Sequence, residues 1–268
     1  MGRRAVVSVA ALMLIMLSCT STGPGGEESL ILIPTSQEVA MGRGMAQEIA
    51  QQERALPDSS WQAYLDRIGQ SIVGVSDREN LDYQFTVLES DQVNAFAAPG
   101  GFIYFYTGML KHMDSEAELA AVVAHEISHV VARHSVKRVQ KAMGAALAYD
   151  LIFGDKGTSQ AMNAAINVGM SLLFAGYSRD AEREADEYGI HYMVKAGYDP
   201  QGAVEMFQTL AELGGAEYDN VFEGLTASHP ETQERIERAR EQIEQMRPLP
   251  SGLKVGREEY QQMISRLN

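Results

Sequence analysis

Cysteine and basic residues are scarce in this sequence. Its 268 residues include a single Cys, and 22 Lys and Arg stand against 36 Asp and Glu, for a formal net charge of −14. A lone cysteine excludes an intramolecular disulfide, so the fold must be held by its core or by a metal. Nucleic acid is disfavoured as a partner, because phosphate binding depends on a basic surface.

Apolar runs of about twenty residues, the length that spans a membrane, are absent from two segments rich in Ala, Met and Leu, 136–153 and 159–175. Membrane spans are therefore not expected there. We expect a tightly packed helical hairpin over 136–175. The alternative is a hairpin that covers a functional cleft or touches lipid.

The first residues have the pattern of an export signal. A basic start is followed by the apolar stretch Ala5–Leu17, too short for a membrane span. Cys19 comes next, as in the cleavage box of bacterial lipoproteins, whose Cys is lipidated and becomes the first residue. We predict a signal peptide over 1–18, lipidation of Cys19 and a flexible tether over 19–35. Ordinary cleavage or an uncleaved anchor is the alternative. Thr20 is not the Asp of inner-membrane lipoproteins, which favours the outer membrane, facing the periplasm of a Gram-negative cell.

One segment carries the chemistry. Within 115–134 the residues His125, Glu126 and His129 form the pattern H-E-x-x-H. Residues four apart share one face of a helix, so both imidazoles can reach one metal ion, while Glu126 lies about a hundred degrees away. This is the arrangement of a zinc peptidase with two His ligands and a Glu as general base. Two His could also fall four apart by accident in a helical core, so a third ligand is needed.

Helix signals around the motif are strong. Ser115 with Glu118 three residues later is a capping box, and the segment that follows has no Pro or Gly. Other helical patterns are predicted over 36–56, 59–75, 178–195, 200–213 and 228–247. The last of these alternates Glu and Arg, which is most simply a solvated face. We expect Trp61 to pack in the core and the tail 249–268 to pack onto a single domain over 36–268.

Strands are predicted before the metal helix. Three stretches have β-rich or alternating patterns: 82–89, 92–98 and 101–106. The turn signal Pro99-Gly100-Gly101 makes the last two a hairpin. An edge strand at Asn94, Ala95 and Phe96 could pair with an extended peptide substrate, or these side chains could simply be core. The predicted fold class is mainly α with a small β-sheet (α+β), with the H-E-x-x-H helix, an edge strand and covering helices.

Helix phase selects the third ligand. One polar stripe in 178–195 should face water: Glu184, Glu187, His191 and Lys195. Glu182 and Asp186, four apart on another face, would then point inward. We assign Glu182 to the metal and Asp186 to a hydrogen bond with a ligand imidazole, which fixes its tautomer. The residues after the second His exclude a metzincin, since Ala132 and Ser135 replace its Gly and His. His134 lies on the wrong phase for a ligand, so we expect a structural role.

The motifs HEISHVVARH, SRDAEREAD and ASHP resemble the gluzincin metallopeptidase family that includes HtpX and the CAAX prenyl endopeptidases. The likeness is greatest to its soluble periplasmic lipoprotein members of the BepA and YggG (LoiP) type. It extends from about Gln37 to the end, although the chain ends without their tetratricopeptide repeats. The resemblance implies a zincin-like core with Glu182 as third ligand and Asp186 as a proton donor. It also implies that His229 can occupy the open metal position and inhibit; a capping His beside Pro230 is the alternative.

We therefore predict a zinc endopeptidase with one Zn²⁺ per chain and Glu126 as general base. It would act on unfolded or extended polypeptides in envelope quality control, attached to the membrane by its lipid. One alternative is a chaperone-like binding protein for outer-membrane precursors with latent peptidase activity. Another is a hydrolase of a different amide, such as a peptidoglycan stem peptide.

Overall fold

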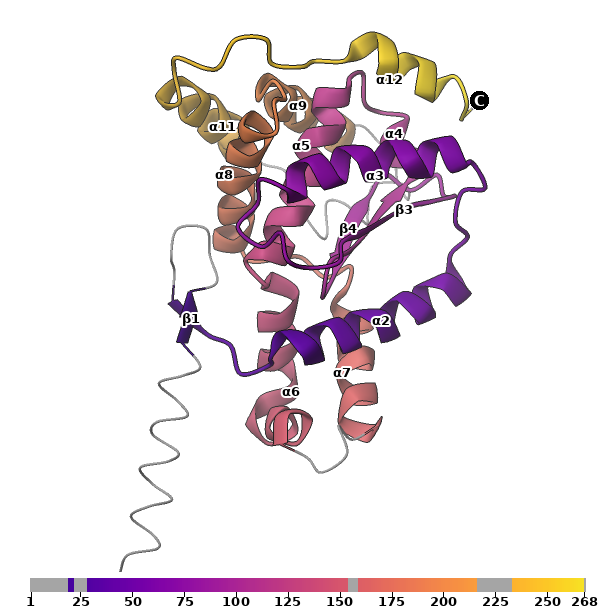
Figure 1. Ribbon diagram of the computed structural model, residues 1–268, viewed down its shortest axis with the longest axis vertical. Coiled ribbons are helices and arrows are strands. Elements are labelled where there is room, and N and C mark those ends of the chain that lie inside the picture. Colours follow the sequence, from indigo (N-terminus) through magenta and orange to yellow (C-terminus); the bar gives the residue numbers. More distant parts are fainter. Residues whose placement is uncertain (1–18, 22–27, 154–158, 216–232, 268) are drawn as a thin grey trace, which may run out of the picture.

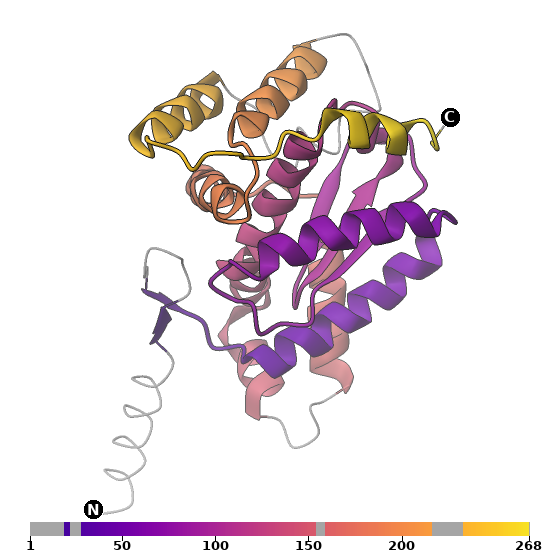
Figure 2. The same ribbon diagram turned by 45° about the horizontal axis from the view of Figure 1, so that its top comes forward.

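The computed structural model describes residues 19–21, 28–153, 159–215 and 233–267. Figures 1 and 2 show a small sheet with helices packed around it. Within the described part of the chain, no helix is both long and apolar enough to cross a bilayer. The predicted signal peptide lies outside these residues, and lipidation of Cys19 stays a prediction.

The segment predicted as a tether is partly ordered. Strands β1 (Cys19–Ser21) and β2 (Glu28–Leu30) pair antiparallel in a sheet of their own. Immediately after them, Ile31 and Ile33 are 5% and 0% exposed. Two apolar side chains at alternate positions therefore pack on the body before helix α2 (Thr35–Gln52) begins. The tether predicted over 19–35 therefore ends in a short segment that packs on the body, because its apolar side chains alternate.

A second sheet contains strands β3 (Gln84–Leu88), β4 (Ala95–Ala98) and β5 (Phe102–Tyr106). Its order is β3-β5-β4, with β5 parallel to β3 and antiparallel to β4. Strand β4 is therefore at an edge. Helices dominate the rest of the described chain, so the predicted α+β class is confirmed.

The turn between β4 and β5 depends on glycine. Gly100 and Gly101 have φ angles of 79° and 95°, a region that side chains with a Cβ rarely adopt. A Cβ on Gly100 would lie 2.8 Å from the Cα of Val39 in α2. The predicted hairpin is confirmed, and its turn packs directly on a helix.

The sheet separates two hydrophobic cores. Odd-numbered residues of β4 face a core that includes helices α3 (Ser59–Val73) and α5 (Glu116–Val131). Even-numbered residues of β4 face a second core that includes α2, as the period of two along a strand requires. Trp61 is fully buried in the first core, where its indole N–H donates to the Met263 carbonyl at 3.0 Å. Its predicted packing role is confirmed.

Helix α5 is buried along its whole length. Ser115 Oγ accepts from the Glu118 N–H at 3.2 Å, and the Glu118 carboxylate accepts from Ser115 Oγ at 3.0 Å and from the Asp114 N–H at 3.1 Å. The predicted capping box is confirmed. Helices α3, α8 (Arg179–Lys195) and α9 (Gln201–Gly215) and strand β4 all contact α5. The capping box fixes where the helix starts, and the packing of these four elements around it excludes water.

A buried carboxylate also anchors the start of α5. Glu116 is 0% exposed. Its oxygens lie 2.9 Å from Arg67 Nη2 and 2.7 Å from Lys254 Nζ, and accept from the Tyr64 hydroxyl at 2.8 Å. Arg67 and Lys254 are themselves partly exposed, and through these contacts α3 and the C-terminal tail hold this end of the helix in place.

The far end of α5 is anchored in the same way. Glu38 of α2, 1% exposed, lies 2.7 Å from Arg78 Nη2 and 2.9 Å from Arg133 Nε. Arg78 also donates to the carbonyl of Val130 at 3.0 Å, in the last turn of the helix. Both ends of α5 are therefore fixed by ion pairs that a buried carboxylate makes with cations of other elements.

Helices α6 (His134–Phe153) and α7 (Ser159–Leu172) pack against each other, and α7 also packs on α2. A Cβ on Gly169 would lie 2.6 Å from the Met45 sulfur, so the helices approach closely. The predicted hairpin is confirmed. Figure 1 shows it at the lower end of the molecule, with α8, α9 and α11 (Gln233–Gln245) towards the upper end.

Helix α8 crosses α5 at close range. A Cβ on Gly189 would lie 3.2 Å from the backbone nitrogen of His125. The carboxylates of the preceding turns of α8 can therefore reach the histidines of α5. The tail ends in α12 (Arg257–Ile264), where buried Tyr260 donates to the carbonyl of Leu110, the last residue of α4 (Thr107–Leu110), at 2.8 Å. The prediction that the tail packs on the body is confirmed.

Candidate metal centre

Three buried side chains from two helices meet at one point: His125 and His129 from α5 and Glu182 from α8. The Nε2 atoms of the histidines lie 3.0 Å apart, and the Glu182 oxygens lie 3.5 and 3.4 Å from them. Ligand atoms at about 2.0–2.1 Å from a tetrahedral zinc ion are about 3.3 Å apart. The three donors predicted from sequence are thus brought together at a spacing that fits such an ion.

Asp186 supports the first histidine. Its Oδ1 lies 2.9 Å from His125 Nδ1. Arg235 of α11 donates to both carboxylate oxygens of Asp186, at 2.8 and 2.7 Å, and its Nη1 lies 3.6 Å from Glu182. The guanidinium also lies over the Phe207 ring, 4.4 Å from its centre. Asp186 therefore makes the predicted contact with a ligand imidazole, and an arginine from a third helix holds its carboxylate in position.

These contacts set the charges at the site. Burial alone would raise the pKa of Asp186, but Arg235 and His125 outweigh it and keep the pKa below its usual value. Burial alone would lower the pKa of His125, but the carboxylates of Asp186 and Glu182 raise it to about 10. For His129 burial prevails, and its pKa lies well below the ordinary value. Of the two imidazoles, His129 is the one held neutral.

The second histidine is supported through another imidazole. His129 Nδ1 lies 2.7 Å from His134 Nδ1, and His134 Nε2 lies 3.0 Å from Glu184 Oε2. The prediction that Glu184 faces water was wrong, because its side chain is only 16% exposed. Periodicity within α8 cannot reveal this contact, because His134 belongs to another helix, α6. His134 is not among the three clustered donors but supports one of them.

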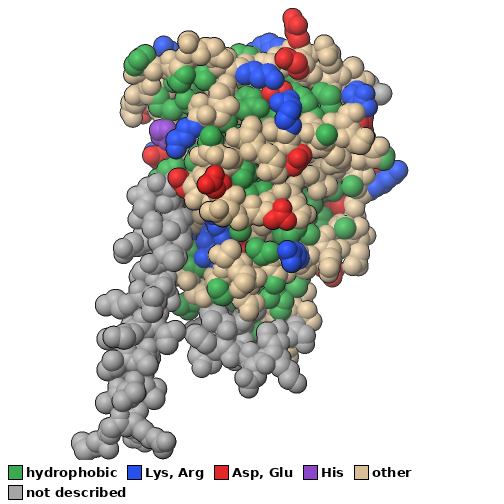
Figure 3. Space-filling model, viewed as in Figure 1, with side chains coloured by type: hydrophobic (Ala, Val, Ile, Leu, Met, Phe, Trp, Pro, Cys, Tyr) green, Lys and Arg blue, Asp and Glu red, His purple; other side chains and the backbone are tan. Residues whose placement is uncertain are grey.

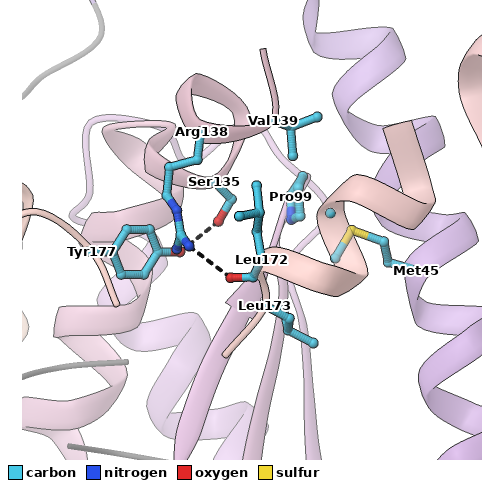
Figure 4. A pocket seen from close by; sticks show the side chains of 9 residues that line it. Met45, Pro99, Ser135, Arg138, Val139, Leu172, Leu173 and Tyr177 are labelled. Carbon is cyan, nitrogen blue, oxygen red and sulfur yellow. Dashed lines mark hydrogen bonds between the residues drawn. The ribbon is translucent and has the colours of Figure 1, made fainter. Parts of the chain in front are cut away.

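Tyr177 covers His129. Its ring stacks on the imidazole with centres 4.1 Å apart and 17° between the planes. Figure 4 shows the Tyr177 hydroxyl bonded to Ser135, at 2.8 Å, and the Arg138 guanidinium beside the ring, 4.6 Å from its centre. The cavity drawn there holds only about 10 Å³ accessible to water, too little for a peptide. Tyr177 therefore shields and orients a ligand.

The predicted general base borders a different cavity. Glu126 is 2% exposed. With His125 it lines a mainly apolar cavity of about 30 Å³ between α5, α9 and β4, whose other walls include Met206, Phe207 and Leu210. Ala95 of the edge strand lines the same cavity. The predicted base and the predicted substrate strand thus border one space.

The other residues of that strand differ from one another. Phe96 is 3% exposed and stacks on Tyr104 with ring centres 5.0 Å apart, so its side chain is core. Asn94 is 0% exposed, yet neither atom of its side-chain amide has a hydrogen-bond partner in the described structure. An unpaired buried amide costs roughly 1–3 kcal/mol, which is unusual unless something else satisfies it.

The roles predicted for His229 and Cys19 stay predictions. His229 lies outside the described residues, so its inhibitory role stays a prediction. The backbone of Cys19 belongs to β1, and its lipidation likewise stays a prediction.

Arg235 is the main residue that the sequence did not reveal. It lies in the charged helix interpreted as a solvated face, but it is only 7% exposed. A signal was present: Arg235 precedes Ala239 by four positions, and both Ala239 and Ile243 are buried on the inner face of α11. The helical phase of α11 therefore predicts that Arg235 faces inward, unlike the exposed charged residues of the same helix.

Comparison with known proteins gives one matching family. The profile of Peptidase family M48 matches residues 59–243. The putative beta-barrel assembly-enhancing protease of Vibrio cholerae is 31% identical over 222 residues, which is 80% of this chain and 45% of that protein. Mitochondrial metalloendopeptidase OMA1 of Arabidopsis thaliana is 30% identical over 188 residues, 69% of this chain and 37% of that protein. Metalloprotease YcaL of Escherichia coli is 26% identical over 225 residues, 83% of this chain and 86% of that protein. The chain thus spans about half the length of the beta-barrel assembly-enhancing proteases that it matches.

Proposed function

The chain belongs to peptidase family M48, and from this premise we propose that it is a zinc-dependent endopeptidase of the bacterial cell envelope. The family predicted from its motifs is the one that matches. The observation that carries the proposal is the buried cluster of His125, His129 and Glu182, with Glu126 on the same helix as the two histidines.

Zinc is the metal that this donor set favours. Two imidazoles and one carboxylate are the protein ligands of a common class of zinc peptidases, in which a further position stays open. Zinc bound there supplies a Lewis acid and lowers the pKa of water towards ~7. The Arg235–Asp186 contact orients His125, and the stacked Tyr177 orients His129. The chain therefore holds its own ligands in place before any substrate arrives.

Glu126 is proposed as the general base. It would take the proton from the attacking water and deliver it to the leaving amine. Both carboxylate oxygens of Asp186 accept hydrogen bonds from Arg235, and one of them also contacts His125 Nδ1. This arrangement supports a positioning role for Asp186 over the proton donation that the resemblance implied.

The substrate is proposed to be an extended polypeptide. Strand β4 is an edge of its sheet and borders the same cavity as Glu126. Backbone pairing with such an edge is independent of sequence. Misfolded or misassembled envelope proteins, which expose such segments, are the proposed natural substrates.

Location and partners are proposed from the N-terminus and the relatives. Five of the matching bacterial proteins are named beta-barrel assembly-enhancing proteases, and this name supports a location of the present chain in the cell envelope. Lipidation at Cys19 would attach this chain to the outer membrane, facing the periplasm. Outer-membrane precursors would then be within reach.

Casein cleavage by the purified chain tests the proposal. Glu126→Gln should retain zinc and lower the rate by about 10²–10⁴-fold, and a chelator should abolish cleavage by the wild type until zinc is restored. Glu187→Gln, an exposed change on α8, is the matched control. Undiminished turnover of Glu126→Gln would reassign the base, and cleavage that resists chelation would remove the metal. If Glu126→Gln still supports envelope assembly in cells, the chaperone-like alternative replaces the protease.

A further inference from the structure

A cavity of about 390 Å³ accessible to water opens beside the metal ligand Glu182. This is within the usual size range of ligand pockets. Its walls come from the start of α8, from α11 and from the segment before α8. The lining side chains are mostly cationic: Tyr177, Arg179, Glu182, Arg183, Glu234, Arg235 and Arg238.

Four arginines on one cavity are unexpected in this chain. Acidic residues outnumber basic ones by 36 to 22 overall. On the face shown in Figure 3, Lys and Arg side chains are interspersed with acidic and apolar ones. The cavity carries two glutamates against its four arginines, so it is locally positive on an acidic protein.

Two of the four arginines already have partners. Arg183 lies 2.7 Å from Glu234 and 3.2 Å from Asp180. Arg235 is committed to Asp186 and lies near Glu182, as described above. Within the protein, these two guanidinium groups are neutralised by carboxylates.

The other two arginines remain available. Arg179 and Arg238 form no ion pair or hydrogen bond with the described residues, and both are exposed. They come from different helices, α8 and α11, and line the same cavity. A guanidinium group binds a carboxylate through two parallel hydrogen bonds. Two such groups facing one solvent-filled space beside the reaction centre form a site for an anionic group.

We propose that this cavity is a substrate subsite that binds a carboxylate close to the scissile bond. The inference rests on the proposed peptidase function and specifies its substrate. Arg235 lines both this cavity and the apolar one beside Glu126, so the two adjoin. A bound chain passing the metal would run along the apolar cavity and place an acidic group in the cationic one. The acidic group is either an Asp or Glu side chain or the C-terminal carboxylate of the substrate.

Matched peptides test the subsite. Fluorogenic peptides with one apolar core should carry Glu or Gln at each of the three positions on either side of the cleaved bond. A parallel pair should end in a free or an amidated C-terminus. At one position, Glu should raise kcat/KM about tenfold over Gln, a typical effect of one charge-assisted contact. The preference should fall with added salt, because exposed charges are screened. An effect confined to the free C-terminus would identify the terminal carboxylate instead of a side chain.

Variants then assign the preference. Arg179→Gln and Arg238→Gln should each reduce the ratio of Glu to Gln cleavage, and the double variant should bring it close to one. Arg240→Gln is the control, since Arg240 is exposed on the same helix and does not line the cavity. Equal cleavage of Glu and Gln peptides at every position, or a preference that survives the double variant, would overturn the subsite.

Binding separates this inference from the proposed function. The same peptides should be titrated against zinc-loaded Glu126→Gln protein, which needs no turnover. Tighter binding of the Glu peptide without cleavage by the wild type would reject the peptidase and keep the anionic site. Cleavage by the wild type with equal binding of both peptides would keep the peptidase and reject the site.

Discussion

The two ligand histidines lie one turn apart on α5, but their supports differ. His125 Nδ1 contacts the carboxylate of Asp186 directly, at 2.9 Å, and Arg235 holds that carboxylate with two hydrogen bonds. His129 Nδ1 contacts the imidazole of His134 at 2.7 Å, and only this second ring contacts a carboxylate, Glu184. One support is charged and comes from two further helices. The other passes through a neutral ring.

This difference assigns the protons. A metal at the Nε2 atoms leaves each Nδ1 as an N–H donor. His129 would donate to His134 Nδ1, and His134 would then carry its proton on Nε2 and donate to Glu184. An imidazole whose N–H contacts a carboxylate is a more basic, and hence stronger, metal ligand than one whose N–H contacts a neutral group. We therefore expect the His125 support to contribute more to metal affinity and the His129 support to act chiefly through orientation.

Breaking the charged support should have the largest effect. Asp186→Asn keeps the shape but removes the charge that faces His125 and Arg235. We expect zinc affinity to fall about 100-fold, at the upper end of the effects seen for such outer partners. The free energy of unfolding should fall by about 3 kcal/mol, the lower end for a broken buried pair, because Arg235 stays buried with only Glu182 as a counter-charge. Competition with a chromophoric chelator and chemical denaturation measure the two. Unchanged zinc affinity would show that the direct carboxylate is dispensable.

Breaking the neutral support should have a smaller effect. His134→Leu leaves His129 Nδ1 without its acceptor, and we expect about a tenfold loss of zinc affinity. Glu184→Gln keeps a hydrogen-bond acceptor for His134 and should cost only about twofold. Glu187→Gln, exposed on the same helix, is the control and should cost nothing. If Glu184→Gln weakened zinc as much as Asp186→Asn, the two supports would be equivalent and the comparison would fail.

Proton release gives the finest distinction between the two ligands. The pKa of His125 is raised to about 10, so in metal-free protein at pH 8 its ring is protonated, whereas His129 is neutral. A metal binds only the neutral ring, and the water bound to zinc has a pKa towards ~7, so loading should release about two protons at pH 8. Zinc affinity should accordingly rise with pH up to about 10. Calorimetry in buffers of different ionisation enthalpy measures the proton count. Release of about one proton, that of the bound water alone, would mean that His125 is already neutral, and Asp186→Asn should lower the count.

Much of the fold could be predicted because its signals are local. The capping box at Ser115 and the turn at Gly100 each act through neighbouring residues. Strand β4 alternates between two cores with the period that its backbone imposes. The tether was the exception, since the burial of Ile33 depends on a surface formed by distant residues.

In the candidate site, too, some features follow from local sequence and others from contacts between distant residues. By itself the sequence determined the donors on α5 and the inward face of α8, because spacing along a helix sets which side chains share a face. Only the tertiary structure decided what surrounds them. Arg235 donates hydrogen bonds to Asp186, Glu184 contacts His134, and the Tyr177 ring stacks on His129. These contacts join residues from separate helices. Their geometry depends on how closely α5, α8 and α11 approach, and no periodicity within one segment encodes that distance.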